Sequence, residues 1–235
     1  MTRLTAGPPS LTAPVPAARP LSPAGRVLAV TARPGQESAE LGGLLFAFRR
    51  AGASLGLLSL TRGEASPLNS TLARLEVIRP WELQLAAGTL GISWVMVASY
   101  PDGALCCQPV DELTERVLRA IRHHQANLLL VIDPAVGDPD DAAVAAAAWT
   151  AARQAGVPIV ARTRPGARGA WMIDLGADAA TARAIQKAAV AAHASQSEAL
   201  SRLTRRLDRL DSREHVRWLV ARHESPAAHR RHQAA

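Results

Sequence analysis

The chain has 235 residues, of which 48% are hydrophobic, enough to bury the core of one domain of ordinary size. Its formal charge is +7, and aromatic residues make up only 3%, so Ala, Leu and Val must fill most of that core. No apolar run approaches the ~20 residues of a membrane-spanning helix, so the sequence predicts no membrane span.

The two ends of the chain differ from its middle. Residues 1–24 contain six prolines and only two charged residues, Arg3 and Arg19, which is unlike a signal peptide and predicts a disordered Pro/Ala-rich arm. Residues 224–235 are predicted to be a basic flexible tail, and residues 25–223 a single domain. The adjacent Cys106 and Cys107 match no metal-binding spacing and are expected to be reduced thiols, which favours a cytoplasmic location.

Apolar runs alternate with helical patterns along the middle of the chain. Short apolar runs predict strands at residues 27–31, 55–60, 92–98, 128–132, 157–161 and 170–175. Helical spacing predicts helices at residues 37–50, 71–90 and 111–124, an Ala-rich helix ending at 155, and two closing helices at 177–195 and 198–223. This alternation predicts an α/β fold, a Rossmann-like, mostly parallel sheet with helices on both faces.

The junction after the first strand is the most informative segment. The strand breaks at Arg33-Pro34-Gly35 and leads into a helix containing Gly42-Gly43. In open α/β sheets such a junction places polar groups at the carboxyl edge, where binding sites occur. The segment resembles the opening motif of the PIG-L/LmbE family of metal-dependent N-deacetylases, in which a strand runs into His-Pro-Asp-Asp-Glu and a Gly-Gly helix.

Six further segments resemble motifs of that family, in the same order, so the resemblance extends over residues 26–220. They are Thr61-Arg62-Gly63-Glu64-Ala65, Arg79-Pro80-Trp81-Glu82-Leu83, Tyr100-Pro101-Asp102-Gly103, the run Asp133–Asp141, His193-Ala194-Ser195-Gln196, and Glu214-His215. The resemblance implies the family's LmbE-like fold.

The resemblance also implies where the family's zinc would be held. The three ligand positions correspond to Arg33, Gln36 and Asp141, the position of the catalytic base to Gly35, and a further family histidine to Asp138. Arginine has no free lone pair, and glutamine offers one neutral oxygen. Because a catalytic zinc site needs about three protein ligands, we predict that this chain has no zinc cofactor.

A fixed guanidinium in the metal's place would balance neighbouring carboxylates. We predict that Arg33 points into the metal position of the family and pairs with Asp141, or with Asp138, through charge-assisted hydrogen bonds. The alternative is that these loop side chains turn to solvent.

The remaining acidic residues allow more than one interpretation. Glu37, Asp138 and Asp140 are the candidates for residual catalytic acids of a rearranged site. Glu37 is also explained as a first-turn carboxylate of its helix. The acidic loop, with Asp141, could cap the next helix or hold Mg²⁺ or Ca²⁺.

A second group of residues matches family positions near the substrate. Arg62, Arg79 and Asp102 are predicted either to contact a small polar or sugar-like ligand or only to tie loops together. His193 is expected to be a packed or capping histidine rather than a catalyst. The complete predicted ligand-binding set is Arg33, Gln36, Arg62, Arg79, Asp102, Asp141 and His193.

Three functions compete. The first is a non-catalytic relative of the family that binds a ligand or a partner in the inherited cleft. The second is an active N-deacetylase or amidase acting on an N-acetylated amino sugar or thiol-sugar conjugate. The third is binding of nucleic acid or an acidic surface through the arginines after residue 201, which otherwise form a solvated helix face. The five tryptophans could mark a homo-oligomer interface, but we expect them to fill the core.

Overall fold

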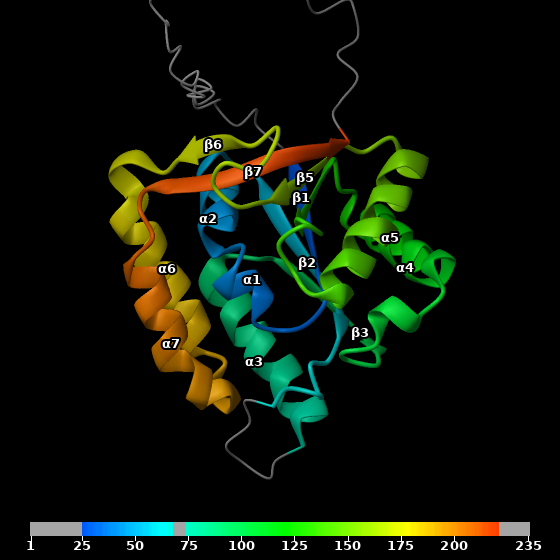
Figure 1. Ribbon diagram of the computed structural model, residues 1–235, viewed down its shortest axis with the longest axis horizontal. Coiled ribbons are helices and arrows are strands. Elements are labelled where there is room, and N and C mark those ends of the chain that lie inside the picture. The colour runs from blue at the N-terminus through cyan, green and yellow to red at the C-terminus, as the bar shows by residue number, and fades with distance from the viewer. Residues whose placement is uncertain (1–24, 68–73, 221–235) are drawn as a thin grey trace, which may run out of the picture.

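In the computed structural model, residues 25–67 and 74–220 are described, so the predicted arm and tail lie outside the described residues. A seven-stranded sheet runs through the centre (Figure 1) in the order β3-β2-β1-β4-β5-β7-β6. The strands β1 to β5 are parallel, whereas β7 pairs antiparallel with both β5 and β6. Their bounds are β1 Arg26–Thr31, β2 Ser54–Thr61, β3 Trp94–Tyr100, β4 Leu128–Ile132, β5 Ile159–Arg162, β6 Trp171–Asp174 and β7 Arg213–Val220.

Helices cover both faces of this sheet, as predicted (Figure 1). Apolar residues of α2, α3 and α6 pack on one face, and those of α4 and α5 pack on the other. The helices are α1 Gln36–Ala39, α2 Gly42–Arg50, α3 Leu75–Leu90, α4 Val110–His124, α5 Pro139–Ala155, α6 Ala179–Ala191 and α7 Ser197–Asp208, with short 3₁₀ turns η1 Leu105–Cys107, η2 Gly176–Asp178 and η3 Ala194–Gln196.

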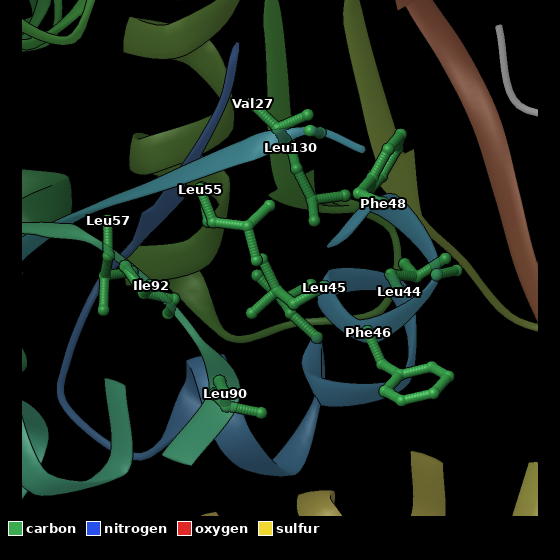
Figure 2. Packing of buried hydrophobic residues seen from close by; sticks show 14 of the residues in the cluster. Val27, Leu44, Leu45, Phe46, Phe48, Leu55, Leu57, Leu90, Ile92 and Leu130 are labelled. Atoms are coloured by element: carbon green, nitrogen blue, oxygen red, sulfur yellow. The ribbon is translucent and has the colours of Figure 1, made fainter. Parts of the chain in front are cut away.

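The central strands are apolar on both faces because both faces are covered. In β1, Val27 belongs to the core under α2 and Leu28 to the core under α4 and α5, in the two-residue period of a strand. Figure 2 shows the first core, where Leu45 of α2 lies close to Leu55 of β2. This packing fixes the start of α2 and hence the loop between β1 and α1.

The paired glycines of α2 have a packing role. A Cβ atom added to Gly43 would lie 1.9 Å from Glu214 Oε1 and 2.5 Å from Arg183 Nη1, and one added to Gly42 would lie 2.6 Å from the Cγ atom of Gln186. The absence of side chains therefore lets α2 approach α6 and β7 closely.

We expect Gly43→Ala to lower the free energy of unfolding by about 1–3 kcal/mol, because the added methyl group collides with a buried ion pair. The matched control is Gly88→Ala in α3, where an added Cβ atom meets nothing within 4 Å. This control should raise the free energy of unfolding by about 0.5–1 kcal/mol through helix propensity. Urea denaturation of both variants measures the difference, and equal effects would contradict the close-packing argument.

The C-terminal prediction of one helix over 198–223 is wrong. Helix α7 ends at Asp208, and β7 follows because its backbone groups pair with β5 and β6. Two arginines of this region form ion pairs with other parts of the domain: Arg206 of α7 binds Glu40, and Arg217 of β7 binds Asp133 with Nη2 2.7 Å from Oδ1.

Two further expectations need correction. The helix predicted over 37–50 is divided into α1 and α2, and the one predicted over 177–195 into η2, α6 and η3. The tryptophans do not all fill the core: Trp171 is buried, but Trp81, Trp149 and Trp218 are exposed by 40% or more. None of the helices within residues 25–67 and 74–220 is long and apolar enough to cross a membrane.

Candidate functional site

The carboxyl ends of β1 and β4 meet where the strand order reverses, since the chain continues from β1 outward to β3 and returns to β4. Such a switch point is where open α/β sheets place their binding crevices. The β1–α1 loop supplies Arg33, the turn after β3 supplies Asp102, and the β4–α5 segment supplies Asp138 and Asp140. Four groups from three distant segments of the chain therefore meet at one sheet edge.

One guanidinium and three carboxylates form the centre of this site. Arg33 donates from Nε to Asp102 Oδ1 at 2.8 Å, from Nη1 to Asp138 Oδ2 at 2.5 Å, and from Nη2 to Asp140 Oδ2 at 2.9 Å. The carboxylates of Asp102 and Asp140 are almost fully buried, with side-chain exposures of 2% and 3%. We name Arg33, Asp102, Asp138 and Asp140 the Arg33 cluster.

The carboxylates of the Arg33 cluster keep the guanidinium of Arg33 in its charged form. Burial opposes the charge of Arg33, but the hydrogen bond to Asp138 and the charges of Asp102 and Asp138 raise its pKa above the ordinary value. Burial likewise works against the charge of Asp138, yet the hydrogen bonds from Arg33 and from the Asp141 amide, together with the charge of Arg33, outweigh burial and lower the pKa of Asp138. The ion pair between Arg33 and Asp138 therefore persists throughout the physiological pH range.

Backbone and side-chain donors fix the buried carboxylates. Asp102 also accepts hydrogen bonds from Thr61 Oγ1 and from the Ala65 amide, each at 3.2 Å. Asp140 accepts from the amides of Gly103 and Leu105, each at 2.8 Å. The site therefore ties the turns after β2 and β3 to the start of α5.

Asp138 and Asp141 cap the helix that follows them, as one interpretation predicted. The Asp141 amide donates to Asp138 Oδ1 at 3.1 Å, and the Asp138 amide donates to Asp141 Oδ2 at 3.3 Å, which makes a capping box at the start of α5. The predicted pair of Arg33 with Asp138 is confirmed, whereas the alternative pair with Asp141 is wrong because Asp141 serves the cap and contacts Gln36.

Gln36 occupies the other oxygen of Asp141. Its Nε2 donates to Asp141 Oδ1 at 2.7 Å, while its Oε1 accepts from the amides of Ala32 and Arg33 at 2.9 and 3.2 Å. Burial raises the pKa of Asp141, because removing the carboxylate from solvent disfavours its charged form.

The residues at the implied ligand positions do not fit a zinc ion. Arg33 has no lone pair to donate, and the oxygens of Gln36 and Asp141 already accept protein hydrogen bonds. Within the described ranges, no three His, Cys, Asp or Glu side chains are placed to hold a metal.

Behind the loop lies a second, fully buried pair. Glu37 Oε1 is 2.7 Å from His193 Nε2 and accepts from Ser38 Oγ at 2.6 Å, and Glu37 Oε2 accepts from the Gly35 amide at 2.7 Å. Burial acts to raise the pKa of Glu37, but the charge of His193 and the hydrogen bonds from His193 and Ser38 together outweigh burial, and the pKa is lowered. Gly35 has φ +98°, a left-handed conformation that favours glycine and that makes room for this turn.

A cavity of about 500 Å³ opens beside these groups. Five residues of the predicted ligand-binding set line it, namely Arg33, Gln36, Arg79, Asp141 and His193. Its other wall is built by residues of β5, the loop after β5, and α7.

Residues 28–152 match the family described as PIG-L: GlcNAc-PI de-N-acetylase, which is more than half of the chain. The chain belongs to the PIG-L family. A comparison with curated proteins gives no match.

Solved structures share the fold of this PIG-L protein over most of its length. N,N'-diacetylchitobiose deacetylase from Pyrococcus horikoshii superposes with a TM-score of 0.69 at 16% identity, over 88% of this chain and 89% of that one. A conserved protein from Thermus thermophilus gives 0.64 at 21%, over 83% and 94%. The 4-carboxy-2-hydroxymuconate hydratase GalB from Pseudomonas putida gives 0.64 at 18%, over 85% and 98%. At these identities the likeness shows the fold alone.

Two members of the predicted ligand-binding set lie outside the cavity wall of the PIG-L protein. Asp102 stands behind Arg33, and Arg62 is exposed on the loop after β2. Arg79 lines the cavity but is buried, and it donates to the carbonyls of Pro34 and Gly63, so it ties two site loops together.

Sequence reasoning missed the arginines of the far wall, Arg162, Arg164 and Arg206. Arg162 ends β5 and Arg164 follows it, so the rule that found the other candidates, polar residues at the carboxyl end of a parallel strand, also applied here. Arg206 carries no such signal, because its place depends on how α7 packs.

Proposed function

We propose that this PIG-L protein is a non-catalytic member of its family that binds a small polar ligand in the 500 Å³ cavity. The observation that carries the proposal is the Arg33 cluster, in which a fixed cation with three carboxylate partners stands where the resemblance implies a zinc ligand. An arginine so placed would repel a divalent cation and cannot coordinate it.

The chemical requirements of amide hydrolysis, compared with the residues at this site, also support the proposal. Metal-assisted hydrolysis needs a carboxylate that takes a proton from the attacking water, and Gly35 at that position offers none. A rearranged site would have to use the residual acids. Glu37 is fully buried against His193, and Asp138 and Asp140 are bound by Arg33, so none is free to act as a base.

The similar structures fit a ligand-binding role in one respect. They include proteins named as deacetylases and one named as a hydratase, so this fold supports more than one chemistry. The function of the PIG-L protein therefore depends on its own cavity residues, which are rich in arginine.

Metal analysis and an acetate-release assay test the proposal. We expect the purified protein, incubated with Zn²⁺ and dialysed, to retain much less than one zinc per chain and to release no acetate from N-acetylglucosamine-containing substrates. The reference is the triple variant Arg33→His, Gln36→Asp, Asp141→His, which rebuilds the three ligand types and should retain more zinc than the wild type. Stoichiometric zinc in the wild type with chelator-sensitive acetate release would overturn the proposal.

A further inference from the structure

Arginine dominates the charge of the cavity wall. Five arginines line the cavity, against two carboxylates, Glu40 and Asp141. The charge of Arg33 is balanced by three carboxylates that do not themselves line the cavity. The remaining four arginines thus exceed the two lining carboxylates, and the wall keeps a net positive charge.

The excess positive charge lies on the wall formed by β5, the loop after it, and α7. There Glu40 Oε2 accepts from Arg162 Nη1 at 2.9 Å and from Arg206 Nη2 at 2.8 Å, so one carboxylate is shared by two guanidinium groups. The side chain of Arg162 is only 15% exposed, and that of Glu40 21%, so this arrangement is held in place. We name Arg162, Arg164 and Arg206 the arginine wall.

Arg164 completes the wall with a charge that has no counterion among residues 25–67 and 74–220. Its one polar contact of note is a long hydrogen bond, 3.5 Å, from Nη2 to the carbonyl of Val136. Among the residues that the structure describes, no carboxylate lies within 4 Å of it. Arg164 is exposed and lines the cavity, so its guanidinium is free to form a bidentate contact.

We propose that the cavity binds a small organic anion and that Arg164, supported by Arg162 and Arg206, holds its phosphate or carboxylate group. A guanidinium presents paired N–H donors that match both oxyanions, and a partly enclosed wall weakens competition from water. The inference rests on the proposed ligand-binding function and names the chemical class of the ligand.

Calorimetric titration of the full chain at low salt tests this, with inorganic phosphate, succinate and neutral N-acetylglucosamine as probes. We expect saturable binding of phosphate or succinate, weakened by added NaCl. Preference for phosphate would indicate a phosphorylated ligand, and preference for succinate a carboxylated one. Failure of both anions to bind, or binding of the neutral sugar alone, would overturn the proposal.

Arg164→Gln should lower the affinity for the anion about tenfold or more, because a charged hydrogen bond is lost. The substitution lies on an exposed loop, so it should leave the core intact. The matched control Arg119→Gln removes one exposed charge from α4, outside the cavity, and should leave the affinity unchanged. Anion binding that is the same in Arg164→Gln and the wild type would overturn the inference.

The two proposals fail separately. Zinc retention with acetate release would overturn the non-catalytic function. An anion affinity that depends on Arg164 would still support the proposed class of ligand. Absence of anion binding in a zinc-free, inactive protein would overturn only the ligand class.

Discussion

Arg33→Ala is expected to lower the free energy of unfolding at neutral pH by about 3–5 kcal/mol, the cost of breaking a buried ion pair from one side. The substitution leaves three carboxylates facing one another without their shared cation, and two of these, Asp102 and Asp140, are almost fully buried. Urea denaturation followed by circular dichroism measures the change. Arg33→Lys should fall between the wild type and Arg33→Ala, since the three N–H donors of an ammonium sit on one nitrogen and cannot span the three separate positions that Nε, Nη1 and Nη2 of the guanidinium occupy.

The pH dependence separates this mechanism from simple loss of packing. The pKa of Asp138 is lowered by Arg33, so in the wild type the pair stabilises the fold above about pH 4 and this stabilisation is lost as the pH falls further. In Arg33→Ala the unpaired carboxylates destabilise the fold only while they are charged. The difference between the two proteins should therefore shrink as the pH falls from about 7 towards about 4.

A surface ion pair provides the control. Arg122 and Glu115 on α4 lie 2.9 Å apart but are more than half exposed, so Arg122→Ala should cost about 0–1 kcal/mol. If Arg33→Ala cost no more than Arg122→Ala, the Arg33 cluster would not be a structural element. The metal position would then be better described as an open pocket.

Local sequence signals were enough to predict the sheet edge and its arginine. The strand at residues 27–31 and the loop at Arg33-Pro34-Gly35 are encoded within a dozen residues, as is the acidic loop before α5. The resemblance to the family's metal-site motifs then predicted that Arg33 meets a carboxylate of that loop. Neither kind of signal could choose the carboxylate, because that choice depends on the rotation of α5 about its axis.

The C-terminal region shows why the remaining features were harder to predict. Residues 198–223 have an amphipathic pattern rich in arginine, which suits a helix. Strand β7 forms because β5 and β6 offer backbone partners from distant parts of the chain, and that pairing leaves little trace in local periodicity. The cavity position of Arg206 escaped prediction for the same reason.

The ion pair above Gly43 is the second site where a large effect is expected. Arg183 Nη1 lies 2.6 Å from Glu214 Oε1 and 2.7 Å from the Oε1 atom of Gln186, and its Nη2 donates to the carbonyl of Asp211 at 3.0 Å. Both partners of the ion pair are only 9% exposed. It joins α6 to β7 and so holds the strand that sequence reasoning missed.

Arg183→Met is expected to lower the free energy of unfolding by about 3–5 kcal/mol at neutral pH, because Glu214 is left charged and buried against Gly43. The double variant Arg183→Met, Glu214→Leu should recover most of this loss, since a buried ion pair and apolar side chains of similar volume are often of comparable stability. Denaturation of the wild type, both single variants and the double variant gives the coupling energy. Recovery would assign the cost to the uncompensated charge. A double variant as unstable as Arg183→Met would instead mean that the hydrogen bonds from Arg183 to Gln186 and to the Asp211 carbonyl hold β7 against α6.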